Sequence, residues 1–172
     1  MATDFDWIGF SELTKRLDDL VGEVREDEMF AEDVRRALTF LYTAGVTMPG
    51  AGDIYEAAGG EEFWSETVDL DGELADERAI EAAVAALARR IMHSVEAAQA
   101  DADIDSEELR DLADTAAQGV RDTCTGLSAG ARYFDEKRFD EASWEWSFGF
   151  DDWGSNAIAA LGALHELLWG AK

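Results

Sequence analysis

Apolar residues recur every three or four positions over most of the chain. This spacing places them on one face of an amphipathic α-helix, whereas a half-buried strand would alternate apolar and polar residues. Before the tryptophan-rich C-terminal segment, helices are predicted over residues 11–25, 30–44, 76–97 and 106–132. The pattern therefore favours an all-α fold.

The residue types near the ends of these predicted helices support the same helix boundaries. Ser11 and Ser106 are suitable N-caps, and Glu107 and Glu108 add negative charge to the first turn of the helix that follows Ser106. Gly45 suits the left-handed position just beyond a helix end. We therefore expect the second helix to end before Gly45.

Residues 45–72 show the least regular pattern. The stretch GVTMPGAGDIYEAAGG is rich in glycine, which is typical of loops, and EEFWSETVDL has room for one helical turn. The segment also carries too many apolar residues for a free linker. We predict an irregular loop that packs on the helical bundle.

The segment WEWSFGFDDWG, residues 144–154, has two interpretations. Taken alone, its first seven residues alternate as a strand does. A single helical stripe, however, accounts for the whole segment from Asp140 to Trp169, and no turn signal divides it. We therefore predict one long helix, whose stripe comprises Trp146, Phe150, Trp153, Ala157, Leu161, Leu164 and Leu168.

Trp144 and Phe148 are one turn apart and lie off this stripe. Large aromatic residues are usually buried, so the N-terminal segment with Trp7 or the loop at residues 50–70 could cover them. Alternatively, the two rings form a surface that binds a partner protein or a second copy of the chain. The sequence leaves both possibilities open.

The charge balance is strongly acidic. The chain has 172 residues, enough for one domain, with 39 Asp and Glu against 14 Lys and Arg, and a net charge of −25. Because the acids are dispersed along the whole chain, we interpret them as adaptation to a salt-rich cytoplasm, where ions screen the repulsion. An acidic decoy that binds a basic partner is an alternative. Nucleic-acid binding is disfavoured, since phosphate contacts need clustered basic residues.

Other features of the sequence favour a soluble cytoplasmic protein. No apolar run approaches the roughly 20 residues that span a bilayer, and the N-terminus lacks the pattern of a signal peptide. Cys124 is the only cysteine, so an internal disulfide is excluded. We interpret it as a buried structural thiol.

Several motifs resemble the bacterial family DUF5063, a domain of unknown function. The C-terminal third is similar to that family in its R-D-x-x-x-G-L, D-E-A-x-W-E-W-x-F-x-F, W-G and A-L-x-A-L-H stretches, and the second helix in its L-Y-x-A-G-x-x-x-P stretch. These begin here at Arg121, Asp140, Trp153, Ala160 and Leu41. The resemblance implies an all-helical fold.

Many members of that family carry F-x-x-H-W-G-x-H in the aromatic segment. Here Asp152 and Asn156 stand in place of the two histidines. A catalytic or metal-binding role that depends on those histidines is therefore not expected in this chain.

Acidic pairs suggest one enzymatic alternative. Glu107, Glu108 and Asp111 have the form E-E-x-x-D, which all-α nucleotide pyrophosphatases use to hold Mg²⁺ against a pyrophosphate. Such enzymes need a second acidic pair on a facing helix, for which Glu141 and Glu145 are the candidates. An acid-rich chain produces such spacings by chance, so we keep this as the weaker hypothesis.

A calcium loop is a poor match. Asp101, Asp103 and Asp105 have the spacing of an EF-hand loop, but Ser106 and Leu112 stand where glycine and glutamate are required. The sequence thus favours a non-catalytic protein-interaction or adaptor module, a single all-α domain of about five helices, without a cofactor.

Overall fold

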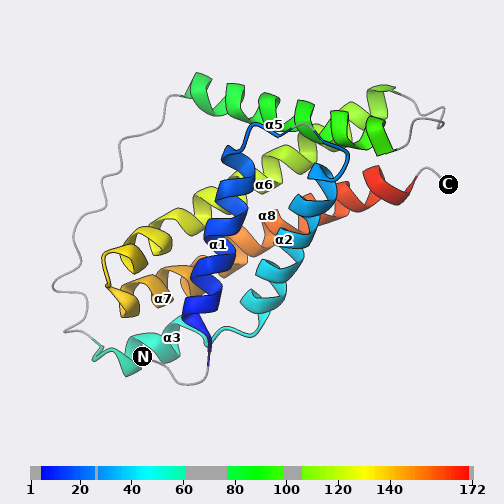
Figure 1. Cartoon of the computed structure of the whole chain (residues 1–172). Coiled ribbons are helices and arrows are strands. Elements are labelled where there is room, and N and C mark those ends of the chain that lie inside the picture. Colours follow the sequence, from blue (N-terminus) through cyan, green and yellow to red (C-terminus); the bar gives the residue numbers. More distant parts are fainter. Residues whose placement is uncertain (1–4, 26, 61–76, 99–105, 171–172) are drawn as a thin grey trace.

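The structure is a computed structural model that describes residues 5–25, 27–60, 77–98 and 106–170 (Figure 1). These residues form helices and connections, without strands, and the predicted all-α bundle is confirmed. The elements are α1 (Trp7–Gly22), α2 (Phe30–Val46), α3 (Ala51–Ala57), α5 (Glu77–Ala98), α6 (Ser106–Asp135), α7 (Phe139–Phe148), α8 (Phe150–His165) and a π-helical turn, η1 (Glu166–Gly170).

Helix α1 begins earlier than the sequence predicted. Asp6, not Ser11, is the N-cap, and its carboxylate accepts a hydrogen bond from the Gly9 N–H at 2.9 Å. Ser11 lies inside the helix and is buried. The early start brings Trp7 into the core, where its ring stacks on Trp146 with centroids 6.2 Å apart.

Helix α2 continues through Gly45 to Val46, so the prediction that Gly45 follows the helix was wrong. The reason is close packing. A Cβ at Gly45 would overlap the ring of Trp153 and lie 2.7 Å from Cε2 of Phe150. The missing side chain therefore lets α2 approach α8, where the rings of Tyr42 and Phe150 also stack.

Part of the predicted irregular loop is helical. Residues 51–57 form α3 after Gly50, with Asp53 in the first turn, where a carboxylate favours a helix N-terminus. Ile54 is buried, and α3 packs against α7. The expected contact with the bundle is thus present for this part, whereas residues 61–72 lie outside the described residues.

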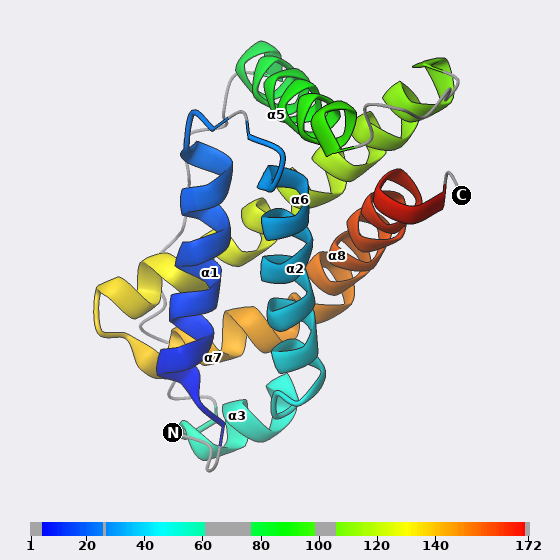
Figure 2. The ribbon, with the colours of Figure 1, turned by 45° about the vertical axis from the view of Figure 1, so that its right-hand side comes forward.

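The predicted long C-terminal helix is two helices. Its apolar stripe is largely buried as expected, but α7 ends at Phe148 and α8 starts at Phe150. Between them Gly149 has a ψ of 0°, which departs from the helical value of about −42°. Figure 2 shows the resulting bend between α7 and α8. Glycine, the poorest helix former after proline, favours the break here.

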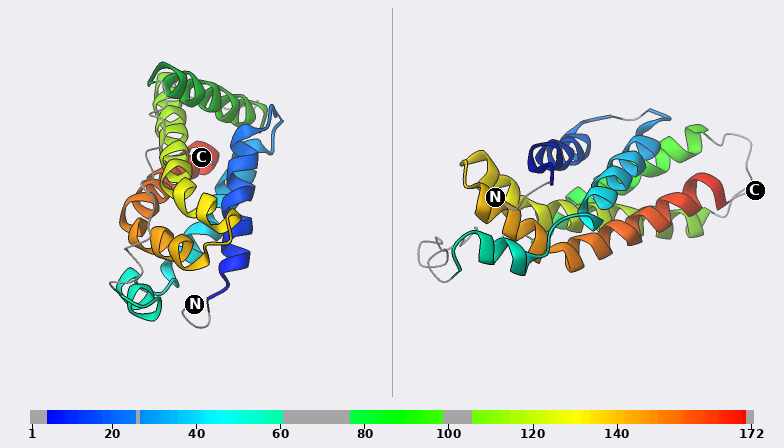
Figure 3. Two further views of the ribbon diagram at one scale, coloured as in Figure 1. Left: turned by 90° about the vertical axis from the view of Figure 1, so that its left-hand side faces the viewer. Right: turned by 90° about the horizontal axis from the view of Figure 1, so that it is seen from below.

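Helices α6 and α8 pack along each other at the centre of the bundle (Figure 3). Trp146 and Trp153 are the largest fully buried side chains among the described residues. The Trp146 indole reaches the backbone of α6, donating to the Leu127 carbonyl at 3.1 Å. Gly130 makes this possible, because a Cβ there would overlap the pyrrole edge of the indole.

Helix α5 crosses one end of the bundle (Figure 3). Arg90 donates to the backbone carbonyls of Val21, at 2.6 Å, and Glu23, at the end of α1. Ser94 accepts the Ala31 N–H and donates to the Glu28 carbonyl, which anchors the start of α2. Both contacts satisfy backbone groups that helix termini leave without intrahelical partners.

Candidate functional site

Trp144 and Phe148 lie one turn apart on α7, and their rings stack with centroids 4.6 Å apart and an interplanar angle of 13°. Both are off the buried stripe, as the sequence predicted. Trp144 is half-buried against the edge of the core, whereas Phe148 is 66% exposed. The two rings form one aromatic face, which we call the Trp144–Phe148 face.

The covering expected for this pair is present only in part. Trp7 packs on the fully buried Trp146 rather than on the Trp144–Phe148 face, and α3 packs on α7. Most of the Phe148 ring remains accessible to solvent. Phe148 is thus exposed in the structure, while residues 61–70 of the loop expected to cover the pair lie outside the described residues.

The end of α7 holds Phe148 in a defined position. The Gly149 N–H still donates to the Glu145 carbonyl at 3.0 Å, so Phe148 belongs to the last regular turn. The Gly149 carbonyl then accepts the N–H groups of Asp152 and Trp153 at 3.1 and 3.0 Å, which starts α8. Because the buried Trp146 anchors the opposite side of α7, the Trp144–Phe148 face is rigid.

The charge around this face is negative. Helices α3, α7 and α8 carry no lysine or arginine. Their carboxylates are Asp53, Glu56, Asp140, Glu141, Glu145, Asp151 and Asp152. The helices that carry and adjoin the face therefore contribute carboxylates without basic residues of their own.

Two of these carboxylates differ in their surroundings. Glu141 accepts hydrogen bonds from Arg138 at 3.0 Å and is therefore paired. Burial raises the pKa of the Glu145 carboxyl above its ordinary value, because removal from water disfavours the charged form. The charged form of Glu145, which lies between Trp144 and Phe148 in the sequence, is thus disfavoured by its burial.

The two acidic groups proposed to hold Mg²⁺ are not brought together. Glu107, Glu108 and Asp111 lie in the first two turns of α6, whereas α7 packs against the other end of that helix. Trp146 contacts Leu127, which is 16 positions beyond Asp111, or about 24 Å along a helix axis. Among the described residues, no three His, Cys, Asp or Glu side chains form a group suited to a metal.

Cys124 is buried, as predicted. Burial, and secondarily the nearby Asp18 carboxylate, raise the pKa of its thiol to about 12. The thiol lies beside a groove of about 510 Å³ between α1 and α6, whose rim is bridged by a 2.6 Å ion pair between Lys15 and Asp135. A thiol so seldom ionised is a poor nucleophile. Asp101, Asp103 and Asp105 lie outside the described residues.

The sequence did not predict a pocket that lies between α5, α6 and α8. It has a volume of about 570 Å³ and is lined by Glu81, Asp114, Gln118, Asp122 and Asn156, among others. The Gln118 amide donates to the Asp122 carboxylate at 2.8 Å. Asp122 belongs to the R-D stretch, and Asn156 stands in place of a family histidine. Only the packing of α8 on α6 reveals that these positions meet.

The fold and the aromatic face define an all-α helical bundle with a partly exposed aromatic pair and no recognisable metal centre in the part that the structure describes. The family model of the Domain of unknown function (DUF5063) matches residues 8–169. The chain belongs to this family. No curated protein and no solved structure matches it. None of the described helices is long and apolar enough to span a membrane.

Proposed function

We propose that this protein is a non-catalytic interaction module, an adaptor that docks a partner protein through the Trp144–Phe148 face. One observation carries the proposal: a large aromatic ring, Phe148, is 66% exposed and yet stacked on Trp144 and held by a helix locked in the core. Rigid aromatic anchors of this kind contribute a large share of binding energy at protein interfaces.

A photocrosslinking amino acid at position 148 tests this proposal directly. The native cell lysate in molar KCl is irradiated, and the same probe at Phe40 is the matched control, since Phe40 is another exposed phenylalanine, on α2. We expect one protein to be crosslinked from position 148 and not from position 40, and to be lost with Trp144→Ala. Equal crosslinking from both positions would overturn the proposal.

The enzymatic alternative, an Mg²⁺-dependent nucleotide pyrophosphatase, has weaker support because one acidic group lies at the start of α6 and the other on α7, which contacts α6 near Leu127. Its assay is simple. Hydrolysis of nucleoside triphosphates that requires Mg²⁺ and disappears with Glu108→Gln would replace the adaptor proposal. We expect no such activity.

The acidic composition supports a second part of the proposal, namely that the protein works in a salt-rich cytoplasm. Repulsion among 39 carboxylates weakens the fold in dilute buffer and is screened by salt. The melting temperature is therefore expected to rise continuously from 0.1 M to 2 M KCl, by about 10 °C or more. A melting temperature that does not change above 0.3 M KCl would contradict salt adaptation.

A further inference from the structure

We propose that the segment bound by the Trp144–Phe148 face is a basic amphipathic helix, with lysine or arginine residues on either side of an apolar anchor. This inference rests on the proposed function and adds the chemistry of the partner. It follows from the carboxylates close to Phe148 in the sequence and from the absence of lysine and arginine in α7 and α8, the helices that carry these carboxylates.

The carboxylates nearest to Phe148 in the sequence come from both sides of the bend. Glu145 precedes it by three residues, and Asp151 and Asp152 follow it by three and four. Glu145 lies one turn before Phe148 on α7, whereas Asp151 and Asp152 belong to the first turn of α8, beyond the bend at Gly149 (Figure 2). Asp151 and Asp152 are both exposed.

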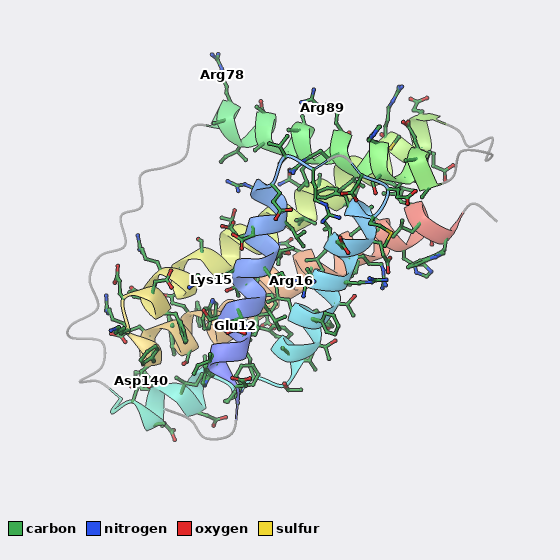
Figure 4. All side chains as sticks on the ribbon, in the orientation of Figure 1. Glu12, Lys15, Arg16, Arg78, Arg89 and Asp140 are labelled. Carbon is green, nitrogen blue, oxygen red and sulfur yellow. The ribbon has the colours of Figure 1, made fainter. Side chains whose placement is uncertain are left out.

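The basic residues that precede α7 in the sequence are Arg132, Lys137 and Arg138. Arg138, at the start of α7, contacts the carboxylates of Glu136 and Glu141. Arg78 and Arg89 project from α5 at the opposite end of the molecule from Asp140 (Figure 4). The helices that carry the aromatic pair and its neighbouring carboxylates, α7 and α8, contain no lysine or arginine of their own.

Basic side chains can bind both the aromatic rings and the carboxylates of this face. A guanidinium group can stack on an aromatic ring and bind a carboxylate at the same time. The protein itself uses this contact inside the fold: the Arg138 guanidinium lies 4.4 Å from the ring centroid of Tyr133 and also binds Glu141. An apolar residue of the partner would cover the exposed edge of Phe148.

A second copy of the chain is a poor occupant. A symmetric contact through the Trp144–Phe148 face would bring the carboxylates of α7 and α8 of one chain against the same groups of the other. Like charges across an interface oppose association. Charge complementarity therefore selects a basic partner over self-association.

The test uses a synthetic helical peptide of about 16 residues, with leucines at helical spacing and lysine and arginine on the flanking positions. Binding to the full chain is measured by fluorescence anisotropy at increasing KCl concentrations. We expect Phe148→Ala to weaken binding at least about tenfold, and the double substitution Asp151→Asn, Asp152→Asn to weaken it about threefold. A peptide with glutamate in place of every basic residue should not bind.

Matched variants separate this site from general attraction to an acidic protein. Phe40→Ala removes an exposed ring that has Arg36 one turn before it, and Asp18→Asn with Asp19→Asn removes the same charge from exposed positions on α1. Neither should change the affinity. Equal weakening by these controls, or a dimer in sedimentation that Phe148→Ala dissociates, would overturn the inference. Failure of the peptide to bind would also overturn it, while the crosslinking result at position 148 would still decide the proposed function.

Discussion

The indole N–H of Trp153 donates a hydrogen bond to the backbone carbonyl of Trp146 at 2.8 Å. In an uninterrupted helix that carbonyl would accept the N–H of Phe150, but α7 ends at Phe148. The indole thus supplies a partner to a buried carbonyl at the bend. Since the Trp146 indole in turn donates to Leu127, the two tryptophans connect α6, α7 and α8 in series.

Substitution Trp153→Phe is predicted to destabilise the protein by about 2–3 kcal/mol. It leaves the buried Trp146 carbonyl without its indole donor and opens a space where Trp153 has no exposed surface. Urea unfolding monitored by circular dichroism in molar KCl measures the change. Trp144→Phe, on the outer side of α7, is the control and should cost less. A larger loss for Trp144→Phe would contradict the assignment of Trp153 to the core.

Gly45→Ala is predicted to destabilise the fold by about 1–3 kcal/mol, because its methyl group would overlap Trp153 and press on Phe150. The control is Gly162→Ala, also inside a helix, where nothing lies within 4 Å of the added Cβ. It should stabilise the protein by about 0.5–1 kcal/mol, since alanine is the better helix former. Equal effects of the two substitutions would disprove the close approach of α2 to α8.

Alkylation of Cys124 is predicted to be slow in the native protein. With its pKa raised to about 12, the thiol is almost entirely protonated at pH 8, whereas an unfolded cysteine with a pKa near 8.5 is partly ionised. Reaction with iodoacetamide, followed by mass spectrometry, should be on the order of 1,000-fold slower than in denaturant, which is roughly the ratio of the two thiolate fractions. The native rate should still increase with pH above 9. Rapid native alkylation at pH 8 would show an accessible thiolate.

Glu145→Gln is predicted to stabilise the protein at pH 7. Because burial raises the carboxyl pKa in the folded state, folding at neutral pH holds a charge where the protonated form is preferred. The melting temperature should rise by about 1–2 °C, and the gain should disappear below about pH 4, where the wild-type carboxyl is protonated in both states. Glu12→Gln removes the same charge from an exposed position on α1 (Figure 4) and is the control. A gain that persists at acid pH would contradict this cause.

The helices were predictable from the sequence because a helix that buries one face carries apolar residues at a spacing of three or four positions. The stripe around Ile91 and the one through Trp153 both form helices that face the core. The ends of helices were less predictable, since Asp6 and Ser11 are equally good caps by residue type and packing of Trp7 decides between them. Local preference can place a cap within several residues, but tertiary contacts select the position.

The candidate site was likewise predictable only in part from the sequence. Helical spacing alone placed Trp144 and Phe148 off the buried stripe. Their unequal exposure depends on what packs against α7, which no spacing reveals. Likewise, Asp122 and Asn156 are 34 residues apart in sequence and line one pocket only because α8 packs along α6.

The bend at Gly149 also constrains how this chain can vary. In α7 the inner residue Trp146 is fixed by its bond to Leu127, and the outer residue Phe148 follows it by two positions. An insertion between them would rotate Phe148 by about 100° around the helix axis relative to Trp146, and would also shift Trp153 away from the Trp146 carbonyl that its indole binds. Changes in chain length should therefore be tolerated in the connection before α7 much better than between these two aromatic residues.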